Sequence, residues 1–503
     1  MIMLLVIGLL AISIILELLI YSLNYLWDRR KVLVSEAIFC AVVSSLLLVI
    51  GWPNIFSYLV LLINCFRIIS MLRILIGQTE VDYLFRNCRK TALWLTLYQI
   101  ITVSLWLGYY YLGRQNTLHN TLLYFVVLQF LSTGTLLWSI RRSIIKTRLP
   151  NKLETLPEYS FPTLSVCIPA RNETTDLYEC LQSLVINNYP KLEILVLDDC
   201  SQTRHTADII RSFAQDGVQF IKGKQPPKSW LAKNWAYQRL LSEANGEIVL
   251  FCGVDIKFGP ETLELLVATL LKKKKTMLSV MPKRLADNIL PLAQSMRYYW
   301  ELAPPRRFFN RPPVLSSCWI ANRKSLLNAG GFAAVQRAIV PEAFFARTFI
   351  KHDGYSFLRS NEKLNLTSTK SIIEQRATAI RTRYPQLHKR LELVLLFLIS
   401  EFWFLFCPFL IFIIGFWYQP FGLIHILSFI TSLLLVVSYS FVVMITMPRA
   451  WLSSLLCFPL VVATDMGMLV YSMLLYNFST VEWKSRDIRV PVMRLKYTNN
   501  KAS

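Results

Sequence analysis

Residues 163–199 read T-L-S-V-C-I-P-A-R-N-E-T-T-D-L-Y-E-C-L-Q-S-L-V-I-N-N-Y-P-K-L-E-I-L-V-L-D-D, and this stretch decides the fold of the middle of the chain. An apolar run at 164–168 is followed by a helical pattern at 177–185 and a second apolar run at 192–197. Further apolar runs follow at 218–221 and 247–251. Short apolar runs that alternate with helical patterns indicate a parallel sheet with crossover helices.

Acidic residues stand where these predicted strands end. Asp198 and Asp199 directly follow the second run, and Asp255 follows the last one. In open α/β sheets, ligands bind at the carboxyl ends of the strands. We therefore expect the function of the chain to reside in this region.

The composition places this region between two membrane blocks. Of the 503 residues, 54% are hydrophobic and only 17% are charged, which is too apolar for a soluble protein of this size. The apolar residues are concentrated at both ends. We predict an N-terminal transmembrane block at 1–148 with about five spans, a soluble domain at 149–390, transmembrane or interfacial helices at 391–480, and a basic tail at 481–503. The predicted N-terminal spans are 1–25, 32–50, 55–76, 91–112 and 121–140.

The net charge of +23 could indicate either nucleic acid or an anionic membrane surface as a partner. Much of the basic charge flanks apolar segments, at 29–31, 86–90 and 141–148. This is the positive-inside pattern rather than a nucleic-acid groove. It predicts a multi-pass plasma-membrane protein whose middle domain and basic tail are cytoplasmic. The ten cysteines include no C-x-x-C pair, which argues against a zinc site and a disulfide framework.

Three apolar stretches follow the soluble domain, at 391–418, 421–447 and 451–476. Three complete crossings from the cytoplasm would leave the basic tail outside, so we expect one stretch to lie in the interface or to re-enter. Glu392 and Glu401 favour the first stretch for this role, while Pro459 and Asp465 weaken the last one as a span.

Four segments of the sequence contain candidate residues for chemistry. Asp198 and Asp199 form either a turn pair or an acceptor for a base or a ribose. Asp255 could hold a hard cation together with phosphate oxygens. Lys233 lies in a Pro-rich loop and helix start that could hold phosphate. Glu342 is either a first-turn helix carboxylate or a general base.

The order of these pieces resembles the family 2 glycosyltransferases, which are inverting enzymes with a GT-A fold. The matching segments are 166–173, 196–201, 223–230 with Lys233, 251–255 and 330–332. The segment 481–486 is also similar to the Trp-Lys-Gly-Arg segment that ends many membrane members, through Trp483, Lys484 and Arg486. The most similar branch comprises the carotenoid-ester and hopanoid-associated glycosyltransferases. The resemblance implies an α/β GT-A domain, with a Rossmann-like and mostly parallel sheet, between two α-helical transmembrane blocks.

The resemblance also implies roles for individual residues. It assigns binding of the nucleotide-sugar, expected to be a UDP-sugar, to Pro169, Arg171, Glu173, Asp198, Asp199 and Lys233. It places Mg²⁺ or Mn²⁺ on Asp255, at the last position of the Asp-x-Asp motif, and the general base at Glu342. The expected activity is transfer of one sugar from a nucleotide-sugar to a lipid-type acceptor.

Two departures from the family pattern leave an alternative open. The first acid of the Asp-x-Asp motif is Gly253, and the family's usual catalytic base is Ala343. The Gln-x-x-Arg-Trp motif of polymerising members is absent, which argues against a processive synthase. The alternative is a degenerate relative that binds nucleotide or lipid as a scaffold. A transporter built on the N-terminal spans is a third hypothesis, weakened by the few charged residues within those spans.

Overall fold

The computed structural model describes residues 30–51, 117–149, 161–284 without 228, 295–303, 312–418 without 388 and 390, and 420–488 without 480 and 485, with eight isolated positions between 58 and 72. The chain divides into two compact units. One comprises 1–125, 390–399 and 492–503, and the other comprises 126–389 and 400–491. The expected nucleotide-sugar site and the start of the tail both lie within the second unit.

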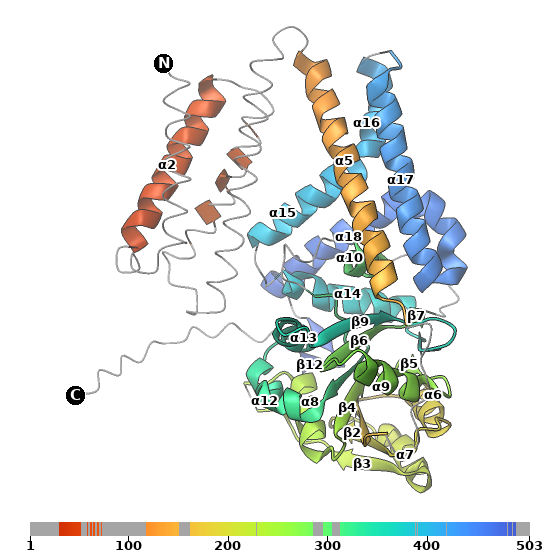
Figure 1. The fold of residues 1–503 in the computed structure, drawn as a ribbon. Coiled ribbons are helices and arrows are strands. Elements are labelled where there is room, and N and C mark those ends of the chain that lie inside the picture. The colour runs from red at the N-terminus through yellow and green to blue at the C-terminus, as the bar shows by residue number, and fades with distance from the viewer. Residues whose placement is uncertain are drawn as a thin grey trace, which may run out of the picture. The chain divides into compact units, whose positions relative to one another are not determined.

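A seven-stranded sheet forms the centre of the second unit (Figure 1). The strand order is β3-β2-β1-β4-β8-β6-β9. The strands are β1 (Leu164–Ala170), β2 (Leu192–Asp198), β3 (Val218–Lys222), β4 (Ile248–Cys252), β6 (Met277–Met281), β8 (Cys318–Asn322) and β9 (Tyr355–Arg359). Only β8 runs antiparallel to its neighbours β4 and β6. The mostly parallel sheet expected from the sequence is therefore confirmed.

Buried apolar residues cover both faces of this sheet, as a parallel sheet requires. One core contains side chains of helices α6 (Thr175–Val185), α7 (His205–Ser212) and α9 (Thr262–Lys272). The other contains side chains of α8 (Ala232–Glu243), α10 (Ser295–Leu302), α12 (Arg323–Asn328) and α13 (Glu342–Ile350). Successive residues of β4 alternate between the two cores: Phe251 belongs to the second core, and Leu250 and Cys252 to the first.

The second core continues into apolar helices of the C-terminal region. It includes residues of α17 (Leu423–Thr446) and α18 (Trp451–Phe478). Tyr299 of α10 contacts α17 twice, through a 3.1 Å hydrogen bond between its hydroxyl and Ser438 Oγ and through the ring of Tyr439, whose centroid lies 5.8 Å away. The seven-stranded sheet and the apolar helices therefore share one core within this unit.

Two small elements complete the unit. A three-stranded sheet, in the order β5-β10-β7, joins β5 (Ile256–Lys257), β10 (Thr367–Ser368) and β7 (Lys283–Arg284). The tail forms a hairpin of β11 (Glu482–Trp483) and β12 (Arg486–Asp487). Remaining elements are α14 (Ile372–Gln386), α15 (Leu391–Glu401), the π-helix η5 (Phe402–Phe406), α16 (Cys407–Tyr418), and the 3₁₀ helices η3 (Ala214–Asp216), η4 (Gly331–Val335) and η6 (Pro448–Ala450).

Among the described residues, four helices are long and apolar enough to cross a membrane: Leu122–Lys146, Leu393–Trp417, Leu423–Thr446 and Pro448–Phe478. The first lies within α5 (Thr117–Lys146) and covers the expected span at 121–140. The expected span at 32–50 is helix α2 (Arg30–Gly51). The expected spans at 1–25 and 91–112, and most of the one at 55–76, lie outside the described residues. The domain boundaries stay a prediction.

Helix α18 is bound along α14, the helix that follows the sheet region. Asp465 of α18 forms an ion pair with Arg383. The Tyr476 hydroxyl donates to the Arg381 carbonyl at 2.8 Å, and Ser472 Oγ accepts from the Tyr384 amide at 3.2 Å. These contacts attach the last apolar helix to a polar helix of the same unit.

Candidate active site

The residues expected to bind nucleotide lie together at the carboxyl ends of β1 and β2. Pro169 is in β1, and Arg171 and Glu173 follow it. Asp198 ends β2 opposite Ala170, and Asp199 comes next. Parallel pairing of β1 with β2 therefore brings the two sequence segments to one edge of the sheet.

The two neighbouring acids have different partners. Asp198 Oδ1 accepts from the amide and the hydroxyl of Ser201, at 3.0 and 2.5 Å, which is the turn-capping alternative. Asp199 is 2% exposed, and its Oδ1 has no hydrogen-bond partner among the described residues. Arg171 Nη1 donates to the Asp199 carbonyl at 2.7 Å and braces this turn. A role of Asp198 in nucleotide binding stays a prediction.

The tail hairpin contacts the same edge. Arg486 Nη1 lies 2.6 Å from Asp199 Oδ2, and Lys484 Nζ lies 3.0 Å from Glu173 Oε2. Arg171 Nε also donates to the Lys484 carbonyl at 3.0 Å. Lys484 has a φ of 48°, in the left-handed region that costs a residue with a side chain about 1 kcal/mol. These contacts confine the tail to the acidic edge that the sequence assigned to the nucleotide.

Burial dominates the electrostatics of both acids. It raises the pKa of Asp199 to about 6, although Arg486 and Arg171 act in the opposite direction. Burial also raises the pKa of Glu173, against the effect of Lys484. Buried carboxylates with such pKa values are candidates for a functional site.

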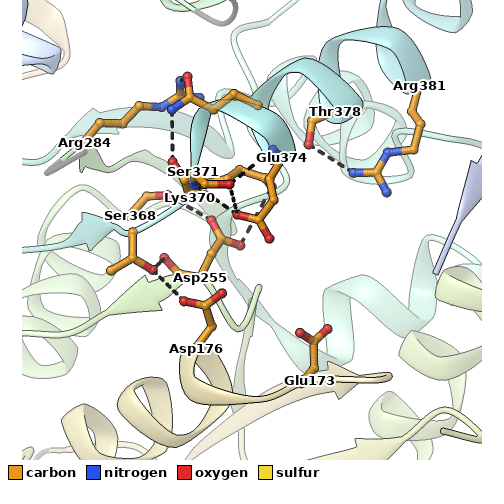
Figure 2. A network of polar contacts seen from close by, with 12 residues as sticks. Glu173, Asp176, Asp255, Arg284, Ser368, Lys370, Ser371, Glu374, Thr378 and Arg381 are labelled. Carbon is orange, nitrogen blue, oxygen red and sulfur yellow. Dashed lines mark hydrogen bonds and ion pairs between the residues drawn. The ribbon is translucent and has the colours of Figure 1, made fainter. Parts of the chain in front are cut away.

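Asp255 lies just beyond β4, beside the small sheet (Figure 2). A Cβ added to Gly253 would lie 2.6 Å from Asp255 Oδ1, so the carboxylate folds back over position 253. Ser368 Oγ donates to Asp255 Oδ2 at 2.9 Å, and Lys370 Nζ lies 4.0 Å from Oδ1. Burial disfavours the ionised form, but Lys370 and Ser368 outweigh it, and the pKa of Asp255 lies below its ordinary value.

Two further acids near Asp255 were not expected from the sequence. The Thr369 hydroxyl lies 3.3 Å from Asp176 Oδ1, and Figure 2 shows Asp176 and Glu374 beside Asp255. Burial, Glu374 and Asp255 raise the pKa of Asp176. Glu374 belongs to a capping box with Ser371 that starts α14. That S-x-x-E pattern could have located the helix, but not its approach to Asp255.

Glu342 and Lys233 lie in the same electrostatic environment. Glu342 is fully buried in the first turn of α13, and neither of its oxygens has a hydrogen-bond partner among the described residues. Lys233 Nζ lies 5.2 Å from the centroid of the Tyr237 ring. Burial lowers the pKa of Lys233, Glu342 and Asp255 raise it, and Arg381 and Lys370 lower it further. The three cations and two acids are therefore close enough to interact.

Asn234 fixes the loop that leads to Glu342. Its buried Nδ2 donates to the carbonyls of Val335 and Ala338, each at 2.8 Å. The Leu231 amide donates to the Gln336 carbonyl at 2.9 Å. Since Asn234 is next to Lys233 in α8, these bonds set the position of Glu342 relative to Lys233.

The residues around Asp255 do not fit a bound divalent cation. Asp255 already accepts from a hydroxyl, and the Lys370 ammonium lies 4.0 Å from its other oxygen. Within the described ranges, no group of three His, Cys, Asp or Glu side chains could hold a metal. Hard cations prefer an all-oxygen set, whereas an ammonium repels them.

Part of the chain is similar to known proteins, and the chain spans about a third or less of the length of the curated relatives that it matches. Residues 165–330 match the model of glycosyl transferase family 2. A probable glycosyltransferase YdaM of Bacillus subtilis is 34% identical over 119 residues, which cover 23% of this chain and 27% of that protein. The glycosyltransferase AglE of Haloferax volcanii is 30% identical over 115 residues, which cover 22% of this chain and 36% of that protein.

Solved structures are similar to this chain as well. A mannosyltransferase, PcManGT from Pyrobaculum calidifontis in complex with GDP-Man and Mn²⁺, is 15% identical with a TM-score of 0.42, and the match covers 71% of this chain and 98% of that one. The family expected from the sequence is thus supported by the family model and by both curated relatives. Residues 165–330 are similar to the family 2 glycosyltransferases, and they contain strands β1, β2, β3, β4, β6 and β8 of the mostly parallel sheet.

Proposed function

We propose that this chain transfers a single sugar from a UDP-sugar to a lipid-type acceptor at the cytoplasmic face of the membrane, with inversion at the anomeric carbon. The observation that carries the proposal is Glu342, a fully buried carboxylate whose oxygens have no hydrogen-bond partner among the described residues. Burial of an unpaired carboxylate is costly. Such a group is expected to persist where it receives a proton from a bound substrate.

The transfer follows from the charges around Glu342. The acceptor oxygen attacks the anomeric carbon, and its proton passes to the Glu342 carboxylate. The bond from that carbon to the diphosphate oxygen breaks, and its electron pair leaves with the diphosphate. Lys370 and Lys233 stabilise the growing negative charge, because both ammonium groups lie within electrostatic reach of Asp255. Attack from the face opposite the leaving group inverts the configuration.

The position of Asp199 supports a nucleotide whose nucleobase carries an N–H donor on its edge. Its Oδ1 is a buried acceptor without a hydrogen-bond partner among the described residues, and uracil offers the N3–H donor. Glu173 and Arg171 would complete the pocket beside Pro169. Nucleotide binding at this edge requires the tail contacts of Lys484 and Arg486 to rearrange or to become part of the pocket.

A lipid-type acceptor, such as those of the carotenoid and hopanoid branch, is supported by the shared core of the sheet and the apolar helices. Tyr299 joins the two through Ser438 and Tyr439 of α17. An acceptor could keep its apolar part in the bilayer while its hydroxyl or carboxylate reaches Glu342.

We further infer that α18, rather than 391–418, lies along the membrane boundary. The contacts of Lys484 and Arg486 with the sheet domain support a tail on the same side of the membrane as that domain, and therefore an even number of crossings between the two. The ion pair of Asp465 with Arg383 attaches α18 to α14, whereas α16 and α17 can form a crossing hairpin.

The test uses purified full-length protein in lipid nanodiscs, a panel of labelled UDP-, GDP- and other nucleotide-sugars, and a native lipid extract. We expect one UDP-sugar to label the lipid fraction. Glu342→Gln should lower the rate by about 10²–10⁴-fold. Glu247→Gln, which changes an exposed glutamate in the same way, serves as the matched control. Equal rates for the Glu342 variant and the wild type would exclude Glu342 as the base.

A scaffold without transfer is the second candidate, and the tail contacts favour it together with Gly253 and Ala343. The ion pairs of Lys484 and Arg486 engage two acids of the expected nucleotide pocket. Absence of transfer by the wild type, with transfer by a Gly253→Asp, Ala343→Asp double variant, would establish this candidate.

A further inference from the structure

The search outside the active site leads to a hollow where two apolar helices end. Its volume is about 550 Å³, and its lining includes Lys283, Arg359, Lys363, Met444, Ile445 and Pro448. Met444 and Ile445 are in the last turn of α17, and the span within α5 ends nearby at Lys146. Figure 1 shows β7 and β9, which carry Lys283 and Arg359, below the ends of α5 and α17.

The hollow is basic, and its cations lack counter-ions. None of Lys283, Arg359 and Lys363 has an ion-pair partner in the part of the chain that the structure describes. Glu362 is a carboxylate of the lining, and it is exposed. Burial and the neighbouring Arg148 lower the pKa of Arg359. A half-buried guanidinium with a second arginine nearby favours binding of an anion.

Backbone and side-chain contacts hold the lining in place. The Arg359 amide donates to the Thr147 carbonyl at 2.9 Å, which ties β9 to the end of α5. The Lys283 amide donates to the Leu366 carbonyl at 3.0 Å. Ser360 Oγ accepts from the Leu366 amide at 2.9 Å, and this closes the loop that carries Lys363. The cations are therefore presented by a braced frame.

We propose that this hollow binds the phosphate headgroup of an anionic membrane lipid. Arg359 and Lys283 contact the phosphate oxygens, and the acyl chains lie along the exposed Met444 and the end of α17. Basic pockets at the cytoplasmic ends of membrane helices recognise anionic headgroups in this way. The site is separate from Glu342 and does not depend on sugar transfer.

The experiment measures lipid retention by native mass spectrometry on full-length protein exchanged into detergent with added phosphatidylglycerol, phosphatidylcholine or inorganic phosphate. We expect retention of phosphatidylglycerol over phosphatidylcholine. The Arg359→Gln, Lys283→Gln double variant should lose about 20-fold in phosphatidylglycerol affinity. An Arg211→Gln, Lys324→Gln double variant removes the same charge from exposed positions and should bind like the wild type.

A charge-conserving double variant, Arg359→Lys with Lys283→Arg, guards against misfolding and should retain the lipid. Equal retention of phosphatidylglycerol and phosphatidylcholine by the wild type would overturn the proposal. So would inorganic phosphate that displaces phosphatidylglycerol at equal concentration, because the site would then recognise free phosphate. Unchanged affinity in the Arg359→Gln, Lys283→Gln variant would overturn it as well.

Discussion

Replacement of Arg486 by methionine tests whether the tail is held at the nucleotide edge by charge. The guanidinium lies 2.6 Å from Asp199 Oδ2, and the side chains of Arg486 and Asp199 are only 16% and 3% exposed. Removal of one partner from a buried ion pair costs about 3–5 kcal/mol when the other charge is stranded. Asp199 can avoid this, because its pKa is already about 6 and rises further without Arg486. We therefore expect the free energy of tail docking to weaken by about 2 kcal/mol, which raises the undocked population roughly 30-fold.

Hydrogen–deuterium exchange of residues 481–488 measures this change. A hairpin whose two strands have two residues each is not stable on its own, so its amides are protected only while the tail is docked. Arg486→Met should raise the exchange rate of this segment about 30-fold at constant pH. Lys484→Met should have a smaller effect, since that pair is more exposed, with 30% and 10% of the side chains accessible.

Arg211→Met is the control, because Arg211 lies in an exposed pair with Asp208 far from the tail in sequence. Its exchange pattern in 481–488 should match that of the wild type. Equal exchange of the tail in wild type and in Arg486→Met would show that the ion pair does not dock it, and would remove the argument that nucleotide must displace or recruit this segment.

Four further predictions follow from the same contacts. Lys370→Met should weaken binding of UDP by about 10- to 100-fold in the presence of a chelator, measured by equilibrium dialysis, whereas Lys370→Arg should retain it; a wild type that binds UDP only with Mn²⁺ would contradict this. Asn234→Ala should lower the free energy of unfolding by about 1–3 kcal/mol and reduce kcat more than it raises KM; an unchanged kcat would show that the loop is positioned otherwise. The raised pKa of Asp199 means that the folded chain binds a proton at this carboxyl more readily than the unfolded chain does. The contribution of Asp199 to the free energy of unfolding should therefore fall by at most about 3 kcal/mol as pH rises from about 4 to about 6. The melting temperature of the wild type should rise relative to that of Asp199→Asn as pH falls through this window. Asp465→Leu should destabilise by about 3 kcal/mol because it removes the carboxylate that pairs with the buried Arg383, and Arg383→Met in the same chain should recover part of the loss of melting temperature.

The fold of the middle domain could be predicted because each buried strand is a short apolar run. The runs at 164–168, 192–197, 218–221 and 247–251 became β1, β2, β3 and β4. The order of the remaining strands, β8-β6-β9, could not be predicted in this way. Strands β8, β6 and β9 join through long connections, and only their packing places β8 antiparallel between β4 and β6. Local patterns carry strand identity but little about long-range order.

In the candidate site, likewise, the residues of local motifs could be predicted but their long-range contacts could not. Arg171, Glu173 and Asp199 lie in contiguous motifs, and parallel pairing of β1 with β2 brings them to one edge. Their partners Lys484 and Arg486 lie about 300 residues later in the chain, and only the structure shows the contact. The tail could be recognised as a motif from its sequence. Its location against the nucleotide edge depends on how α18 returns to the sheet domain, which hydropathy does not determine.

Gly253, at the first position of the Asp-x-Asp motif, shows that the effect of a motif change depends on its three-dimensional surroundings. The absence of a side chain at 253 lets the Asp255 carboxylate fold back over that position, where a Cβ would lie 2.6 Å from Oδ1. The same carboxylate is contacted by Ser368, in the strand β10 that pairs with β5, and lies 4.0 Å from Lys370, two residues further along the chain. Gly253 and Lys370, which are 117 positions apart in the chain, thus both lie next to the Asp255 carboxylate. A diphosphate needs positive charge there, and an ammonium can supply it as a metal ion does. We therefore predict that Lys370 neutralises the leaving group in the proposed transfer, and the Lys370→Met variant tests this.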